Sequence, residues 1–314
     1  MSSIKAYFKW LVLGITLFFI NSTFRNHWQA VTEVRIDFPG FGLLFLALIL
    51  TLLAHIWSAI VWIQILQLFK QSCQYRWGLK TYLVTNIYKY LPGNVGHFYG
   101  RISAISKQGI SLAIASLTVL LEPLLMAAAA LLIALLSHSI GLIETTKNVK
   151  ILFLQCFLLI IVLVGIHPII INRVIGFIKK LKNKQKFEEK ETVYLQKYPS
   201  IILLGEILFL LLRGLGFILA LMAFMSISFQ QIQMIISAFS FAWLLGLVIP
   251  GAPAGLGVFE ATIIALLETS SLPIEIVLTT IAIFRIISIV AEVMGAGLAY
   301  FGLNSQDEKI RPRR

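Results

Sequence analysis

A set of charged residues lies inside otherwise apolar stretches of the chain, and these side chains are the strongest candidates for chemistry. Burying a charge in an apolar medium is costly, so each one needs either a partner or a function. The set comprises Arg101, Glu122, Glu206, Arg213, Glu260, Arg285 and Glu292. We interpret Glu206 and Glu292 as paired charges that lock helix packing, and we assign the other five to a binding site. Four of these five, all except Arg213, are expected to converge in one polar cavity.

Two breaks rich in glycine and proline accompany these charges. A helix that starts after such a break exposes free N–H groups and the positive end of its dipole, which suits a phosphate or carboxylate. We therefore expect the breaks to join the arginines in binding an anionic lipid headgroup. The residues concerned are Gly93, Asn94 and His97 in the first break and Gly255 and Gly257 in the second.

Residues for common enzyme chemistry are scarce. The only aspartates are Asp37 and Asp307, so an Asp-x-Asp site for a metal-bound nucleotide is absent. The histidines are scattered without the spacing of metal ligands. Neither a Gly-x-Ser-x-Gly elbow nor a Walker A loop occurs. The sequence thus predicts no enzyme activity, no metal site and no cofactor.

The elements that carry these residues are long apolar segments. Hydrophobic residues make up 59% of the 314 residues and charged residues 13%, whereas a soluble domain has about 25% charged residues. Segments of roughly 18 or more apolar residues can cross the hydrocarbon as helices. We predict an all-α, polytopic membrane protein in a single transmembrane domain, residues 1–314. Full crossings are expected at about 7–24, 41–67, 111–137, 151–176, 200–226 and 274–302.

Two further apolar stretches, 79–108 and 231–270, contain the breaks and are predicted to form re-entrant helical hairpins. Each hairpin lies between two predicted crossings, so the chain reads as a first unit, 41–137, and a second unit, 200–302. Three crossings separate the first helices of the units, which gives the units opposite orientations. Such an inverted repeat is a recurring plan of transporters. The alternative is a coincidence of hydropathy.

The basic residues predict the orientation. The formal net charge is +12, and lysines are densest between Lys179 and Lys197, inside the polar loop 178–199. Because basic loops of membrane proteins face the cytoplasm, we expect this loop and both termini to be cytoplasmic. The same distribution explains the positive charge without a nucleic-acid partner.

Three motifs together resemble a known family. They are Tyr90-Leu91-Pro92-Gly93-Asn94-Val95-Gly96 followed by Arg101, the run from Pro250 to Glu260, and Phe284-Arg285-Ile286-Ile287-Ser288. They are similar to the lysylphosphatidylglycerol synthase transmembrane family, the flippase-like domain of the multiple peptide resistance factor, over about residues 10–302. The chain departs from the family pattern at two places. It has Pro253-Ala254-Gly255 in place of Pro-Gly-Gly, and Glu122-Pro123 in place of an acidic–basic pair.

The resemblance implies a lipid flippase of the cell inner membrane, whose substrate is a phospholipid or a polyprenyl-linked lipid. The soluble aminoacyl-transfer domain of the resistance factor has no counterpart in this chain. Two other interpretations stay open. The chain could be a non-transporting membrane partner of a glycosyltransferase or lipid-modifying enzyme, or a secondary transporter of small solutes.

Overall fold

The computed structural model describes residues 35–90, 95–139, 149–182, 194–249, 255–268, 272–302 and 311–312. Helices dominate this part of the chain, as the sequence predicts, and the one sheet is a two-residue pairing of β1 (Gln71–Ser72) with β2 (Arg311–Pro312). The predicted crossing at 7–24 lies outside the described residues, as do Gly93 and Asn94.

The helices follow one another along the chain as α3 (Phe38–Leu68), α4 (Tyr75–Asn86), η1 (Ile87–Tyr90), α5 (Gly96–Ser106), α6 (Leu112–Ser139), α7 (Val149–Gly165), α8 (Pro168–Lys182), α9 (Ser200–Met222), α10 (Phe229–Val248), α11 (Val258–Leu267) and α12 (Ile274–Gly302). Within the described ranges, five are long and apolar enough to cross a membrane, namely α3, α6, α9, α10 and α12. The chain is therefore a multi-pass membrane protein.

Three predictions about the elements need correction. The crossing expected at 151–176 is not one straight helix, because α7 and α8 meet at an angle of 60°. Pro168 opens α8, where its missing N–H and fixed φ are tolerated. The loop expected at 178–199 begins later, since α8 continues to Lys182. One arm of the second hairpin, α10, is by itself long enough to span a bilayer.

Side-chain caps mark where two of the crossing helices begin. The carboxylate of Asp37 accepts a hydrogen bond from the backbone N–H of Gly40 over 2.8 Å, which satisfies a free donor in the first turn of α3. At the start of α10, Ser228 and Gln231 exchange side-chain and backbone hydrogen bonds in a capping box. These polar caps fix the residue at which each helix begins.

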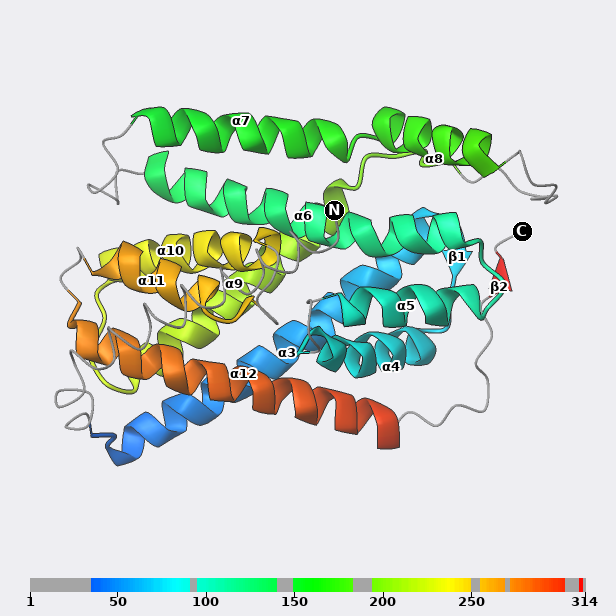
Figure 1. Cartoon of the computed structure of the whole chain (residues 1–314). Coiled ribbons are helices and arrows are strands. Elements are labelled where there is room, and N and C mark those ends of the chain that lie inside the picture. The colour runs from blue at the N-terminus through cyan, green and yellow to red at the C-terminus, as the bar shows by residue number, and fades with distance from the viewer. Residues whose placement is uncertain are drawn as a thin grey trace, which may run out of the picture.

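The two hairpins enter the helix bundle from opposite ends (Figure 1). The arms α4 and α5 enter from the end at which α12 finishes, whereas α10 and α11 enter from the end at which α12 starts. Along the chain, α3 and α12 run toward the first of these ends, and α6 and α9 run toward the other. The inner ends of the described arms consequently lie toward the middle of the bundle.

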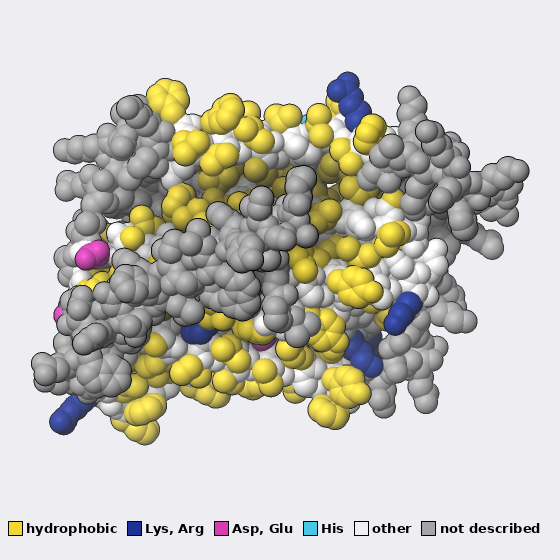
Figure 2. Space-filling model, in the orientation of Figure 1, with side chains coloured by type: hydrophobic (Ala, Val, Ile, Leu, Met, Phe, Trp, Pro, Cys, Tyr) yellow, Lys and Arg dark blue, Asp and Glu magenta, His cyan; other side chains and the backbone are white. Residues whose placement is uncertain are grey.

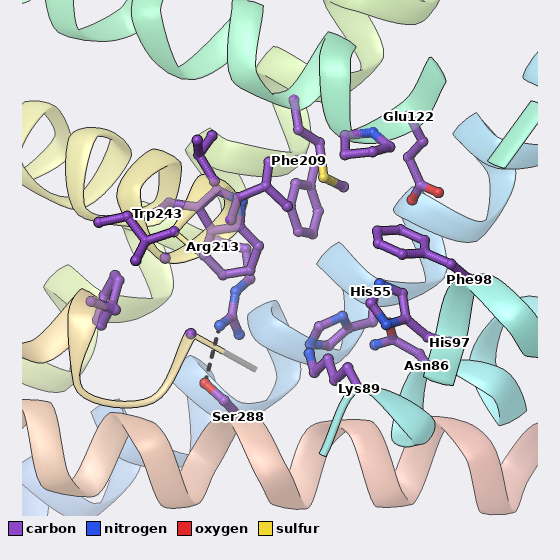
Figure 3. A pocket seen from close by; sticks show the side chains of 18 of the residues that line it. His55, Asn86, Lys89, His97, Phe98, Glu122, Phe209, Arg213, Trp243 and Ser288 are labelled. Carbon is purple, nitrogen blue, oxygen red and sulfur yellow. Dashed lines mark hydrogen bonds between the residues drawn. The ribbon is translucent and has the colours of Figure 1, made fainter. Parts of the chain in front are cut away.

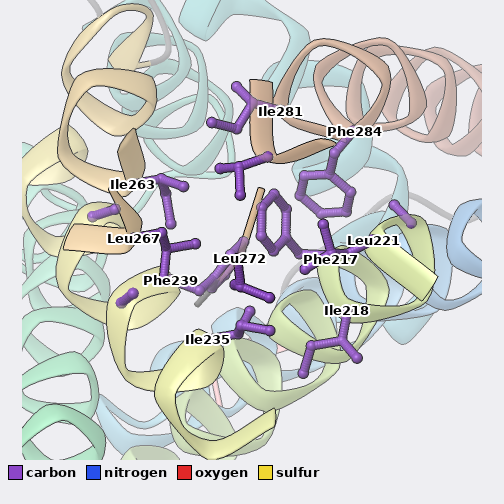
Figure 4. Close-up of a cluster of buried hydrophobic side chains, with 14 of the residues drawn as sticks. Phe217, Ile218, Leu221, Ile235, Phe239, Ile263, Leu267, Leu272, Ile281 and Phe284 are labelled. Carbon is purple, nitrogen blue, oxygen red and sulfur yellow. The ribbon is translucent and has the colours of Figure 1, made fainter. Parts of the chain in front are cut away.

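Aromatic packing holds the second hairpin against its neighbours (Figure 4). Phe217 of α9 and Phe284 of α12 meet edge to face at 5.3 Å between ring centroids. The ring of Phe239 on α10 lies 5.7 Å from Phe217 and 6.0 Å from Phe284. The two arms touch at glycines, because a Cβ built on Gly255 would lie 2.9 Å from the carbonyl oxygen of Gly246. This close approach holds Gly255 beside α10.

The outside of the bundle is apolar. The face in Figure 2 carries mainly hydrophobic side chains wherever the structure describes it, and charged side chains lie mostly toward the two ends of this face. Large exposed side chains on the bundle include Phe45 on α3, Phe157 on α7 and Phe301 on α12. Such a surface suits lipid tails, so polar chemistry has to lie inside the bundle.

Candidate functional site

A cavity of about 250 Å³ lies where the two hairpins meet. Its lining comes from every helix of both units, from α3 to α6 and from α9 to α12 (Figure 3). The predicted site residues that line it are His97, Arg101, Glu122, Arg213, Gly255, Glu260 and Arg285. Gly257 lies beside the cavity lining but is not part of it. The four charges predicted to converge thus do lie around one cavity.

Arg101 and Glu122 form a buried ion pair between α5 and α6. One guanidinium nitrogen of Arg101 lies 2.5 Å from a carboxylate oxygen of Glu122, and the two residues are 2% and 3% exposed. The Tyr82 hydroxyl donates to the second oxygen of Glu122 over 2.5 Å. The guanidinium also lies over the Tyr82 ring at 3.7 Å. The basic partner of Glu122 is therefore supplied from α5 instead of from the next position in α6.

Glu260 and Arg285 form a second pair, between α11 and α12. The carboxylate of Glu260 accepts hydrogen bonds from Nε and Nη2 of Arg285, the former over 2.8 Å. Its other oxygen accepts from the backbone N–H of Gly257 over 2.6 Å. We expected the N-terminus of α11 to bind an external anion. This expectation is wrong for the N–H of Gly257, because that N–H already donates to the carboxylate of Glu260.

A third pair joins η1 to α12. Nζ of Lys89 donates to Oε1 of Glu292 over 2.6 Å, and Nε2 of His55 lies 3.2 Å from the same oxygen. Lys89 and His55 both line the cavity, whereas Glu292 lies behind them. The sequence analysis did not single out Lys89 for the site. Its place directly before the first break, one residue ahead of Tyr90-Leu91-Pro92-Gly93, was the available signal.

Arg213 is held differently from the other site cations. Its Nη2 donates to the Ser288 hydroxyl over 3.1 Å, and its guanidinium lies 5.2 Å from the Trp243 ring and 5.0 Å from the Phe284 ring (Figure 3). Among the described residues, Nε and Nη1 of Arg213 have no hydrogen-bond partner, and no carboxylate pairs with it. Aromatic faces and one hydroxyl therefore hold this buried cation.

Glu206 does not behave as the packing pair that its sequence position suggested. It is fully buried on α9, and neither carboxyl oxygen has a hydrogen-bond partner within the described part of the chain. It also lies outside the cavity lining. Glu292, by contrast, has the charged partner that was expected. The partner is Lys89, which lines the cavity.

Comparison with known proteins gives one family. The model of the family described as "Lysylphosphatidylglycerol synthase TM region" matches residues 8–294. The match confirms the resemblance drawn from the three motifs, and it includes both hairpins and all of the site residues described above. No curated protein matches the chain.

Proposed function

Because the chain belongs to the lysylphosphatidylglycerol synthase transmembrane-region family, we propose that it is a lipid flippase. In this proposal the headgroup of a phospholipid or polyprenyl-linked lipid crosses the membrane through the cavity between the hairpins. The observation that carries the proposal is the placement of Arg101, Glu122, Glu260 and Arg285 around one cavity inside an apolar bundle. Charged groups at such a depth are costly and are typical of a substrate path.

The dimensions of the cavity favour a headgroup as its occupant. Its volume of about 250 Å³ lies near the lower end of ligand pockets. It suits a phosphate group with its hydration. The tails would remain outside, against the exposed Phe, Leu and Ile side chains of the bundle. This division separates the polar and apolar halves of one lipid molecule.

We infer an inverted repeat as the basis of movement. The first unit, 41–137, and the second unit, 200–302, each place a hairpin between two long helices, and the hairpins enter from opposite ends. In each unit an ion pair joins the second arm of the hairpin to the next helix, Arg101 to Glu122 in the first and Glu260 to Arg285 in the second. Transporters with such repeats open to each side alternately by rocking one unit against the other.

We propose that the protein moves lipid without modifying the lipid, driven by a gradient or by mass action, in the cell inner membrane. The lysines of 178–199 and the basic tail favour a cytoplasmic location for both termini. A glycosyltransferase or lipid-modifying enzyme would supply or consume the lipid.

Transport in proteoliposomes tests the proposal. Liposomes with the purified protein would contain phosphatidylglycerol labelled on an acyl chain with a fluorophore that dithionite quenches. Without movement, dithionite quenches the outer leaflet alone, about half of the signal. We expect nearly complete quenching with the wild-type protein, and the half-value with empty liposomes and with Arg285→Ala. A folded wild-type protein that leaves quenching at half would refute transport of this lipid and favour the partner role.

A further inference from the structure

The charges around the cavity do not balance. The lining contributes the cations Lys89, Arg101, Arg213 and Arg285. Carboxylates pair with all of these except Arg213, through Glu292, Glu122 and Glu260 respectively. The breaks at 91–94 and 250–254, which lie outside the described residues, contain no Asp or Glu. Within the described part of the chain, the lining therefore has one cation, Arg213, that is not paired with a carboxylate.

The carboxyl of Glu206 does not fill this role. It lies seven residues before Arg213 on α9, which corresponds to about 10 Å along a helix. Glu206 is also absent from the cavity lining, whereas Arg213 is part of it. An anion that neutralises Arg213 by contact therefore has to enter through the cavity.

The geometry of Arg213 is that of a preformed binding group. Ser288 accepts from Nη2 and itself donates to the backbone oxygen of Phe284 over 2.7 Å, which fixes the hydroxyl. Trp243 and Phe284 hold the guanidinium by their ring faces. Nε and Nη1, which lie on different edges of the planar guanidinium, are left over. Each can donate a charge-assisted hydrogen bond to an oxygen of a phosphate or carboxylate group.

A second donor without a partner lies in the same lining. The indole N–H of Trp243 is buried and, within the described part of the chain, has no acceptor. Buried N–H donors normally have a hydrogen-bond acceptor. Unpaired N–H groups on Arg213 and Trp243, whose side chains lie next to each other, therefore indicate a missing acceptor. The missing partner is rich in oxygen and carries negative charge.

We propose that Arg213 is the residue that recognises the substrate, and that its ligand is a phosphate group bearing one negative charge. This inference rests on the proposed function, and it names the substrate class as a lipid with a monoanionic phosphodiester headgroup. Phosphatidylglycerol, with one net charge, fits Arg213, the one lining cation that the described residues leave without a carboxylate. Phosphatidylcholine fits less well because its quaternary ammonium repels the site. Inorganic phosphate has the same recognition chemistry and is separated from a lipid by experiment.

The first readout is transport of acyl-labelled phosphatidylglycerol and phosphatidylcholine in proteoliposomes. We expect the wild type to prefer phosphatidylglycerol, and Arg213→Gln to move it at least tenfold more slowly and without preference. Arg213→Lys keeps the charge but loses the planar set of N–H donors, so it should retain the preference at a reduced rate. The control is Arg173→Gln, which removes an exposed arginine of α8 and should leave both rates unchanged.

The second readout is ligand-induced stabilisation in detergent, which does not depend on transport. Phosphatidylglycerol should raise the melting temperature of the wild type and of Arg173→Gln, and should not raise that of Arg213→Gln. If inorganic phosphate raises the melting temperature of the wild type but not of Arg213→Gln, and phosphatidylglycerol raises neither, the site stands and its ligand is free phosphate. If the wild type is stabilised but moves no lipid, the Arg213 site stands and the flippase proposal fails. Equal stabilisation of the wild type and of Arg213→Gln by phosphatidylglycerol overturns the inference. So does equal stabilisation by phosphatidylglycerol and phosphatidylcholine of the wild type and of Arg213→Lys.

Discussion

Lys89 on η1 donates a hydrogen bond to Glu292 on α12 over 2.6 Å, across 203 positions of sequence. This pair joins the first unit to the second. The other two ion pairs of the cavity, Arg101 with Glu122 and Glu260 with Arg285, each stay within one unit. His55 of the first unit also approaches Glu292, at 3.2 Å. If the units rock against each other, the contacts of Lys89 and His55 with Glu292 have to open.

Removing one member of this pair should be costly. Glu292→Gln leaves Lys89 buried against α12 without a carboxylate, and breaking a buried pair in this way typically costs about 3–5 kcal/mol. We expect a clear loss of thermal stability in detergent. The double variant Lys89→Met/Glu292→Met should recover most of the loss, since apolar side chains replace both charges. The exposed Glu268→Gln of α11 serves as the control and should melt like the wild type. Equal melting temperatures for Glu292→Gln and Glu268→Gln would contradict the prediction.

Glu260 has two separable roles, and a conservative substitution separates them. In Glu260→Gln the amide oxygen can still accept from the N–H of Gly257, so the start of α11 is preserved. The charge opposite Arg285 is lost, however. We expect Glu260→Gln to insert and to elute as a folded protein, with lipid transport at least tenfold slower. Glu260→Ala should lose the cap as well, at about 1 kcal/mol of additional stability. Wild-type transport by Glu260→Gln would show that the pair has no part in movement.

The contact between the arms of the second hairpin depends on Gly255. Its φ is +69°, and an added Cβ would lie 2.9 Å from the carbonyl oxygen of Gly246. Gly255→Ala should therefore destabilise the protein by at least about 1–2 kcal/mol from its left-handed backbone alone. Gly297→Ala is the matched control, because a Cβ at this helical position meets nothing within 4 Å. It should stabilise α12 by about 0.5–1 kcal/mol. A chemical-denaturation series on both variants measures the contrast.

Burial slows the reaction of the Cys73 thiol with alkylating reagents. It lies between β1 and α4, outside the crossing helices, and desolvation raises the pKa of its thiol to about 11. Since the thiolate is the reactive form, a raised pKa means little reaction at pH 7. We expect alkylation by iodoacetamide to accelerate about tenfold for each pH unit up to about pH 10. Mass spectrometry of the Cys156→Ser protein measures this rate. A rate at pH 8 equal to that of free cysteine would show that the thiol is not buried.

Hydropathy was enough to predict the long helices, and local pattern was not enough to predict the partners in the site. The predicted range 274–302 coincides with α12, 41–67 falls within α3, and 111–137 starts one residue before α6 and ends inside it, because a bilayer demands long apolar segments. Lys89 and Glu292 meet through tertiary packing, which no local spacing encodes. The pattern Gly257-x-x-Glu260 did contain a usable signal. An acidic residue three positions after a helix start commonly folds back onto it, and this signal argues against a free anion site there.

Glu206 is a buried carboxyl group for which the described residues supply no hydrogen-bond partner. It is 0% exposed, and neither oxygen is hydrogen-bonded within the described ranges of the chain. An unsatisfied buried polar group costs about 1–3 kcal/mol, and a side chain of similar size without polar atoms avoids this cost. We therefore expect Glu206→Met to raise the free energy of unfolding by an amount in this range, measured as a higher melting temperature.

Transport by the same variant decides what the carboxyl group is for. If Glu206 has no role in movement, Glu206→Met should be more stable and equally active in the proteoliposome assay. Leu203→Met, on the same helix and partly buried in the neighbouring apolar clusters, controls for the added methionine. A Glu206→Met protein that melts higher but moves lipid more slowly would mean that the buried acid is retained for transport at the expense of stability. A lower melting temperature would instead show that Glu206 has a stabilising partner, and would contradict the prediction.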